Sequence, residues 1–127
     1  GSFTLKEGAT VENKAGGAQF HNGDISGNII CKGAENHDSS RYAFKSFNSV
    51  YNATATITQT GGGALRSILG GNITSSAAAG KLSFESKLSI NTDATITLNS
   101  SNAFTTEGAS TQGESNFYLM NQKIEGK

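Results

Sequence analysis

Four residues that could carry out acid–base chemistry fall within one stretch of seven positions: Glu35, His37, Asp38 and Arg41. Carboxylates can bind a cation or activate a reacting group, and a nearby arginine can stabilise developing charge, as the cleavage of acidic polysaccharides requires. Active sites usually collect such groups from several segments of a chain. We therefore favour a polar loop with no catalytic residues, and keep a polysaccharide-acting enzyme as the alternative.

A second set of residues suits surface binding better than catalysis. Thr54, Thr56 and Thr58 alternate along one segment, and Thr95 and Thr97 would extend the same face on a neighbouring turn of a coil. A flat threonine array is the surface that solenoid ice-binding proteins present, although outward threonine is also an ordinary strand residue. These five threonines predict a binding surface, with ice binding as a minor alternative.

Motifs for metals and cofactors are missing from the sequence. It contains no zinc-type spacing, phosphate-binding loop, dinucleotide fingerprint or calcium-loop consensus, so we predict no metal and no cofactor. Cys31 is the single cysteine and cannot form an internal disulfide. We expect it to be a small buried residue of the core.

The charge balance excludes two classes of partner. Ten basic and ten acidic residues are interleaved along 127 positions. No basic stripe is present to follow a phosphate backbone, which argues against nucleic acid. No long apolar or polybasic run is present, which argues against insertion into a membrane. The length fits one β-rich domain over residues 1–127.

Alternation of apolar and polar residues is the main structural signal. It marks residues 53–58, 82–90 and 94–98, and glycine, asparagine, aspartate or serine lies at or near each end of these segments. A period of two residues is typical of half-buried β-strands, and the bounding residues favour turns. The sequence therefore predicts an all-β protein.

A repeated phrase indicates how these strands are arranged. Ala-Thr-Ile-Thr occurs at 55–58 and at 94–97, and Asn52, Asn72 and Asn91 each open a segment of about 20 residues. Such spacing favours a right-handed parallel β-solenoid, or β-helix, in which the two phrases stack on each other. The alternative is an antiparallel β-sandwich, whose strands also alternate.

One stretch departs from the strand pattern. Phe44, Phe47 and Tyr51 are spaced as on one face of a helix, and Asp38, Ser39 or Ser40 could cap its start. We therefore predict a short amphipathic helix near residues 39–51 that covers an apolar face or end of the coil.

The chain resembles the passenger domains of bacterial autotransporters and related parallel β-helix surface proteins. The stretches that carry this resemblance are GATVEN at 8–13, GGAQFHNGDISGNI at 16–29, GGALRSILGGNIT at 62–74 and INTDATITLNSSNAF at 90–104. The resemblance implies export by a bacterium and an adhesive, toxin or scaffold role, and it supplies no catalytic residues.

Together these features predict a non-enzymatic protein that is secreted or displayed on a cell surface. We expect a structural or adhesive segment, or a self-associating subunit, of a bacterial surface protein or fibre. Its expected partners are copies of itself or flanking turns of a larger protein, together with a host receptor or a carbohydrate.

Overall fold

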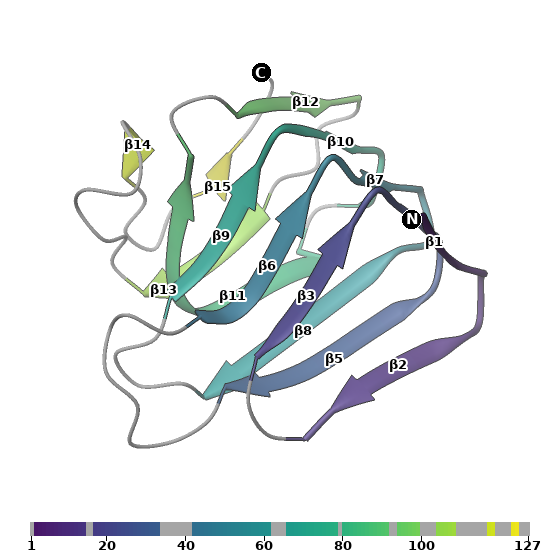
Figure 1. Cartoon of the computed structure of the whole chain (residues 1–127), viewed down its shortest axis with the longest axis horizontal. Helices are drawn as coiled ribbons and strands as arrows, with labels where there is room; N and C mark the ends of the chain where they lie inside the picture. The colour runs from purple at the N-terminus through teal and green to yellow at the C-terminus, as the bar shows by residue number, and fades with distance from the viewer. Residues whose placement is uncertain are drawn as a thin grey trace.

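All regular structure that the computed structural model describes is β-strand, and the strands wind into a parallel β-solenoid with three faces (Figure 1). The described residues are 2–14, 17–33, 42–61, 66–78, 80–91, 94–99, 104–108, 117–118 and 123–124. Every pairing among β1 to β13 is parallel. The predicted solenoid is therefore confirmed, and the sandwich alternative is excluded.

Face A is a five-stranded parallel sheet. Its strands, in spatial order, are β1 (Phe3–Leu5), β4 (Gly23–Ile25), β7 (Val50–Tyr51), β10 (Asn72–Ser75) and β12 (Thr95–Leu98). In each strand the outward residue stacks on the outward residue of the next turn. Thr97, for example, stacks on Thr74, and Thr74 stacks on Val50.

Faces B and C form one continuous sheet because β11 (Leu82–Ile90) runs across both. Face B contains β2 (Thr10–Asn13), β5 (Asn28–Gly33), β8 (Thr56–Gly61), the first part of β11 and β13 (Phe104–Gly108). Face C contains β3 (Ala18–His21), β6 (Tyr42–Phe47), β9 (Arg66–Gly70) and the last part of β11. Two short antiparallel strands follow: β14 (Phe117–Tyr118) pairs with β11, and β15 (Lys123–Ile124) pairs with β13.

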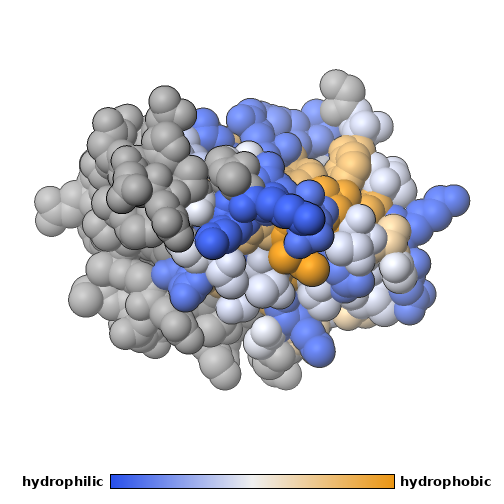
Figure 2. Space-filling model, turned by 90° about the horizontal axis from the view of Figure 1, so that it is seen from below, coloured by the Kyte–Doolittle hydropathy of each residue, from blue (hydrophilic) through white to orange (hydrophobic). Residues whose placement is uncertain are grey.

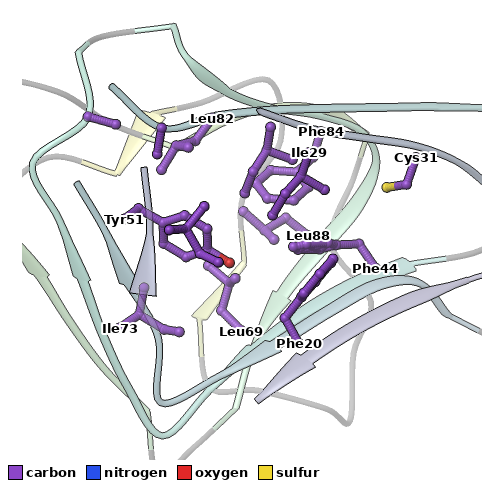
Figure 3. Packing of buried hydrophobic residues seen from close by; sticks show 14 of the residues in the cluster. Phe20, Ile29, Cys31, Phe44, Tyr51, Leu69, Ile73, Leu82, Phe84 and Leu88 are labelled. Atoms are coloured by element: carbon purple, nitrogen blue, oxygen red, sulfur yellow. The ribbon is translucent and has the colours of Figure 1, made fainter. Parts of the chain in front are cut away.

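The interior is a column of apolar side chains that point inward from all three faces (Figure 3). Four phenylalanines form a chain of ring contacts along it. Their centroids are 5.3 Å apart for Phe3 and Phe20, 5.7 Å for Phe20 and Phe44, and 5.4 Å for Phe44 and Phe84. Cys31 lies in this core, as predicted. Alternation places every second residue inside, which is how a chain of low hydrophobic content fills a narrow core.

The corner between faces C and A turns through residues in the left-handed backbone region. Asn22, Asn48 and Gly71 have φ angles of 53°, 51° and 63°. Asparagine and glycine tolerate this conformation best. The turn that contains Gly71 is one residue longer than the turn that contains Asn48. The backbone N–H of the extra residue, Asn72, donates to the side-chain oxygen of Asn48 at 3.0 Å. A side chain at Gly71 would occupy the space that the Asn48 amide fills.

The helix predicted near residues 39–51 is wrong. Residues 39–41 lie outside the described part, but Tyr42–Phe47 form β6 and Val50–Tyr51 form β7. Phe44 and Tyr51 point into the core while Phe47 stacks on the outside, so the helical spacing was coincidental. Aromatic residues favour strands, and the left-handed Asn48 would interrupt a helix.

The stacking predicted for the two Ala-Thr-Ile-Thr phrases is also wrong. Thr56–Gly61 is on face B, whereas Thr95–Leu98 is on face A. The turns do not follow a 20-residue period: from Thr10 to its partner Asn28 is 18 residues, and from Asn28 to Thr56 is 28. Asn72 stacks on Thr95, so the three asparagines do not mark equivalent positions.

Candidate functional site

The five predicted threonines do not form one surface. Thr56 and Thr58 lie on face B, Thr54 lies in the turn before them, and Thr95 and Thr97 lie on face A. The Thr54 hydroxyl donates to the Ser26 carbonyl at 2.7 Å, and the Thr56 hydroxyl donates to the Asn28 side-chain oxygen at 2.7 Å.

The outward residues of face B are polar except where Ile30 interrupts them. Thr58 stacks between Ile30 and Ser83, and Ile30 is 40% exposed. Figure 2 views the molecule from this side and shows polar side chains around a small apolar patch. The continuous threonine array that ice binding would use is therefore absent from the described part of this face.

The charged cluster of Glu35, His37, Asp38 and Arg41 lies outside the described residues. Within the described ranges, no group of three or more histidine, cysteine, aspartate or glutamate side chains is arranged to bind a metal. The described part also contains no helix with the length and apolar character needed to cross a membrane.

A polar ladder follows the corner between faces A and B, and the sequence did not reveal it. Its members, which stack from turn to turn, are Ser26, Asn52, Ser76 and Asn99. The Asn52 amide donates to Ser26 Oγ at 2.8 Å and also to Asp24 Oδ1 at 2.7 Å. The Asn99 amide donates to Ser76 Oγ at 3.2 Å. The sequence signal that could have revealed the ladder is an Asn or Ser directly after the last inward-facing residue of each strand on face A.

An aromatic cluster lies on the outer side of β3 and β6, and we define it as His21, Phe47, Tyr42, Lys45 and Gln19. The His21 and Phe47 rings stack at 5.0 Å with an interplanar angle of 11°. The Lys45 Nζ lies 3.9 Å from the centre of the Tyr42 ring, a cation–π contact. The Gln19 amide contacts the His21 ring nitrogen. The cluster combines ring surfaces with hydrogen-bonding groups.

Among the described residues, the two groups with shifted pKa values, Cys31 and Tyr51, are both inside the coil. Burial raises the pKa of the Cys31 thiol from 9.0 to about 11. Burial also raises the pKa of Tyr51, although its hydrogen bond with Ser46, at 2.6 Å between the two hydroxyl oxygens, acts in the opposite direction. A thiol that holds its proton is a poor nucleophile, so Cys31 acts as a core residue.

Comparison with protein-family models, with curated proteins and with solved structures finds no match to this chain.

Proposed function

We propose that the chain is a non-enzymatic structural and adhesive protein, acting as a segment or self-associating subunit of a bacterial surface protein or fibre outside the cell. The observation that carries this proposal is a coil built by repetition. Inward apolar side chains continue from turn to turn, and a polar ladder of Ser26, Asn52, Ser76 and Asn99 follows one corner of the coil. In such a coil each turn contacts only its neighbours, which suits a scaffold that can be lengthened.

The aromatic cluster supports the adhesive part of the proposal. Rings beside amide and ammonium donors can contact both the apolar face and the hydroxyl groups of a sugar. The His21 and Gln19 side chains are exposed, and those of Tyr42, Lys45 and Phe47 are half-buried. We therefore favour a carbohydrate as the ligand of the adhesive surface.

Display of the chain on a non-adherent bacterium tests this function. We expect displaying cells to be retained on immobilised host glycans several-fold more than cells with an empty carrier. His21→Ala and Gln19→Ala should reduce retention, because they remove one ring and one amide from the cluster. Thr60→Ala, an exposed change on face B, is the matched control and should leave retention unchanged.

Two results would contradict the proposal. Retention equal to that of the empty carrier would remove the adhesive role. Release of new reducing ends from a polysaccharide by the purified chain would favour the enzyme alternative, and a Glu35→Gln variant would then show whether the polar cluster is responsible.

A further inference from the structure

The fold separates charges that are interleaved along the sequence. The strands of face C contain three cationic residues, Lys45, Arg66 and Lys87, and no residue of β3, β6, β9 or the last part of β11 is acidic. By contrast, the exposed acidic residues Glu12 and Glu85 lie on β2 and on the first part of β11. A chain with no net charge therefore has one face whose strands are cationic.

Lys45 occupies the border between the open and the covered part of face C. Its strand, β6, pairs with β3 on one edge and with β9 on the other. In the row of stacked residues that contains it, Gln19 is exposed, Lys45 is half-buried and Ile68 is 3% exposed. A ligand on the open part of the face would therefore reach Lys45 at the edge of its contact area.

The Tyr42 ring holds the ammonium group of Lys45 from one side. The Nζ atom lies 3.9 Å from the centre of the ring, close enough for a cation–π attraction. An ammonium group has three N–H donors, and this contact does not require all of them. No carboxylate among the described residues forms an ion pair with it. Its remaining donors are therefore available to a ligand.

The unpaired ammonium group decides the charge of that ligand. The rings of His21 and Phe47, which stack at 5.0 Å, lie in the row beside Gln19 and Lys45. A sugar that covers these rings therefore removes water from Lys45 as well. Loss of water from a half-buried cation is unfavourable unless a counter-charge replaces it. An anionic group on the sugar supplies that charge and accepts charge-assisted hydrogen bonds.

We propose that the aromatic cluster binds an anionic sugar, one that carries a carboxylate or a sulfate group. The inference rests on the proposed function and names the chemical class of its carbohydrate. The Lys45 ammonium group binds the anion. The His21 and Phe47 rings contact the apolar side of the sugar ring, and the Gln19 amide hydrogen-bonds a hydroxyl group.

A nucleic acid fits this surface less well than an anionic sugar does. Binding to a phosphate backbone depends on many cationic side chains along a continuous track. The described strands of face C contain three cationic residues, and Lys45 lies beside a pair of stacked rings. One cation next to ring surfaces suits a single acidic sugar unit.

Matched pairs of polysaccharides test the charge of the ligand with the unmodified chain. We expect immobilised hyaluronan, which carries carboxylates, to bind at least about tenfold more tightly than carboxyl-reduced hyaluronan. Dextran sulfate and neutral dextran form the second pair. A preference for the charged member of either pair supports the proposal and shows which anion is accepted. Equal binding of the charged and neutral members in both pairs would overturn it.

Charge variants show which group binds the anion. Lys45→Gln removes the charge but keeps a hydrogen-bonding side chain, so it should weaken binding of the preferred charged polysaccharide by about tenfold. Lys45→Arg keeps the charge and the contact with an aromatic ring, so it should restore most of the affinity. Lys81→Gln, the matched control, removes an exposed charge outside face C and should change binding by less than about threefold.

Two results of these measurements would overturn the assignment. Equal losses in Lys45→Gln and Lys81→Gln, both with an unchanged circular dichroism spectrum, would show an effect of net charge alone. Binding of duplex DNA as tight as that of the charged polysaccharide would show a surface that accepts any polyanion.

Retention of displayed cells separates this inference from the proposed function. Cells that adhere equally well to neutral and to acidic glycans would overturn the anionic ligand and leave the adhesive role intact. Cells that adhere to no glycan, charged or neutral, would overturn the adhesive role itself.

Discussion

Two segments of the coil share a local structure and lie on different faces. In each segment an alanine N–H donates to the carbonyl of the asparagine three residues earlier: Ala55 to Asn52 at 3.0 Å, and Ala94 to Asn91 at 2.9 Å. In both, the next residues are Thr-Ile-Thr, with the isoleucine inside. The first segment leads from face A to face B, whereas the second leads from face C to face A.

The difference teaches that a short phrase specifies a turn and a strand but not a position in the coil. What distinguishes the two segments is their surroundings. In the first segment, β8 lies between β5 and β11. In the second, β12 is paired with β10 and is the outermost strand of its sheet in the described part of the chain. The same residues should therefore contribute different amounts to stability.

The isoleucines provide the largest test of this difference. Ile57 is 0% exposed, and Ile96 is 7% exposed on the outermost strand. Ile57→Ala should lower the free energy of unfolding by about 4 kcal/mol, and Ile96→Ala by about 2 kcal/mol, since a cavity in the middle of a sheet relaxes least. Urea unfolding measures both values, and equal losses would contradict the assignment of the two strands.

The residue before each segment gives a smaller, pH-dependent test. Tyr51 precedes the first segment and Ile90 the second, so only the first has a buried titratable group there. The pKa values of Tyr51 and of Cys31 are raised in the folded chain. The unfolded chain therefore loses these protons first, and stability that is fully present below pH 9 falls as the pH rises.

We expect a loss on the order of 2 kcal/mol between pH 9 and pH 11. Urea midpoints at several pH values measure it. The Tyr51→Phe and Cys31→Ala double variant is the control: it should be less stable at pH 7, and its midpoint should change less with pH. A wild-type midpoint that stays constant up to pH 11 would show that neither group is buried as described.

The two asparagines that open the segments give the smallest effect. The Asn52 amide has two ladder partners, Ser26 and Asp24. Asn52→Ala should lower the free energy of unfolding by about 1 kcal/mol, because both hydrogen bonds are partly open to water. The Asn91 side chain is outside the ladder, so Asn91→Ala should lower the free energy of unfolding by about 0.5 kcal/mol or less. Thermal unfolding of the two variants side by side measures this, and the reverse order would argue against the ladder.

The sequence predicted the strands and the coil because their signal is local. Alternation around Ile57 and Phe84 is enough to mark inward residues, and a polar, glycine-rich chain favours stacked short strands. The sequence did not show which face of the coil each strand lies on. Corners of different length make the spacing between stacked residues irregular, so the register cannot be counted along the chain. Between faces A and B, two residues separate β4 from β5, whereas six separate β10 from β11.

The errors at the candidate sites have the same origin. The threonines were grouped by sequence likeness, but Thr97 has Thr74 as its neighbour and Thr58 has Ile30. Phe47 was grouped with Phe44 by helical spacing, whereas it lies on the outside and stacks on His21. The corner ladder depends on which turns are adjacent, and no single segment of the sequence records that.

Paired cysteines on the outer surface test the coil most directly. Thr97 stacks on Thr74 on face A, whereas Thr58 is on face B. The Thr74→Cys and Thr97→Cys double variant should form an intramolecular disulfide under mild oxidation, because adjacent parallel strands lie about 4.8 Å apart. The Thr58→Cys and Thr97→Cys variant should remain reduced. Rapid closure of the second pair, with none in the first, would contradict the three-faced coil.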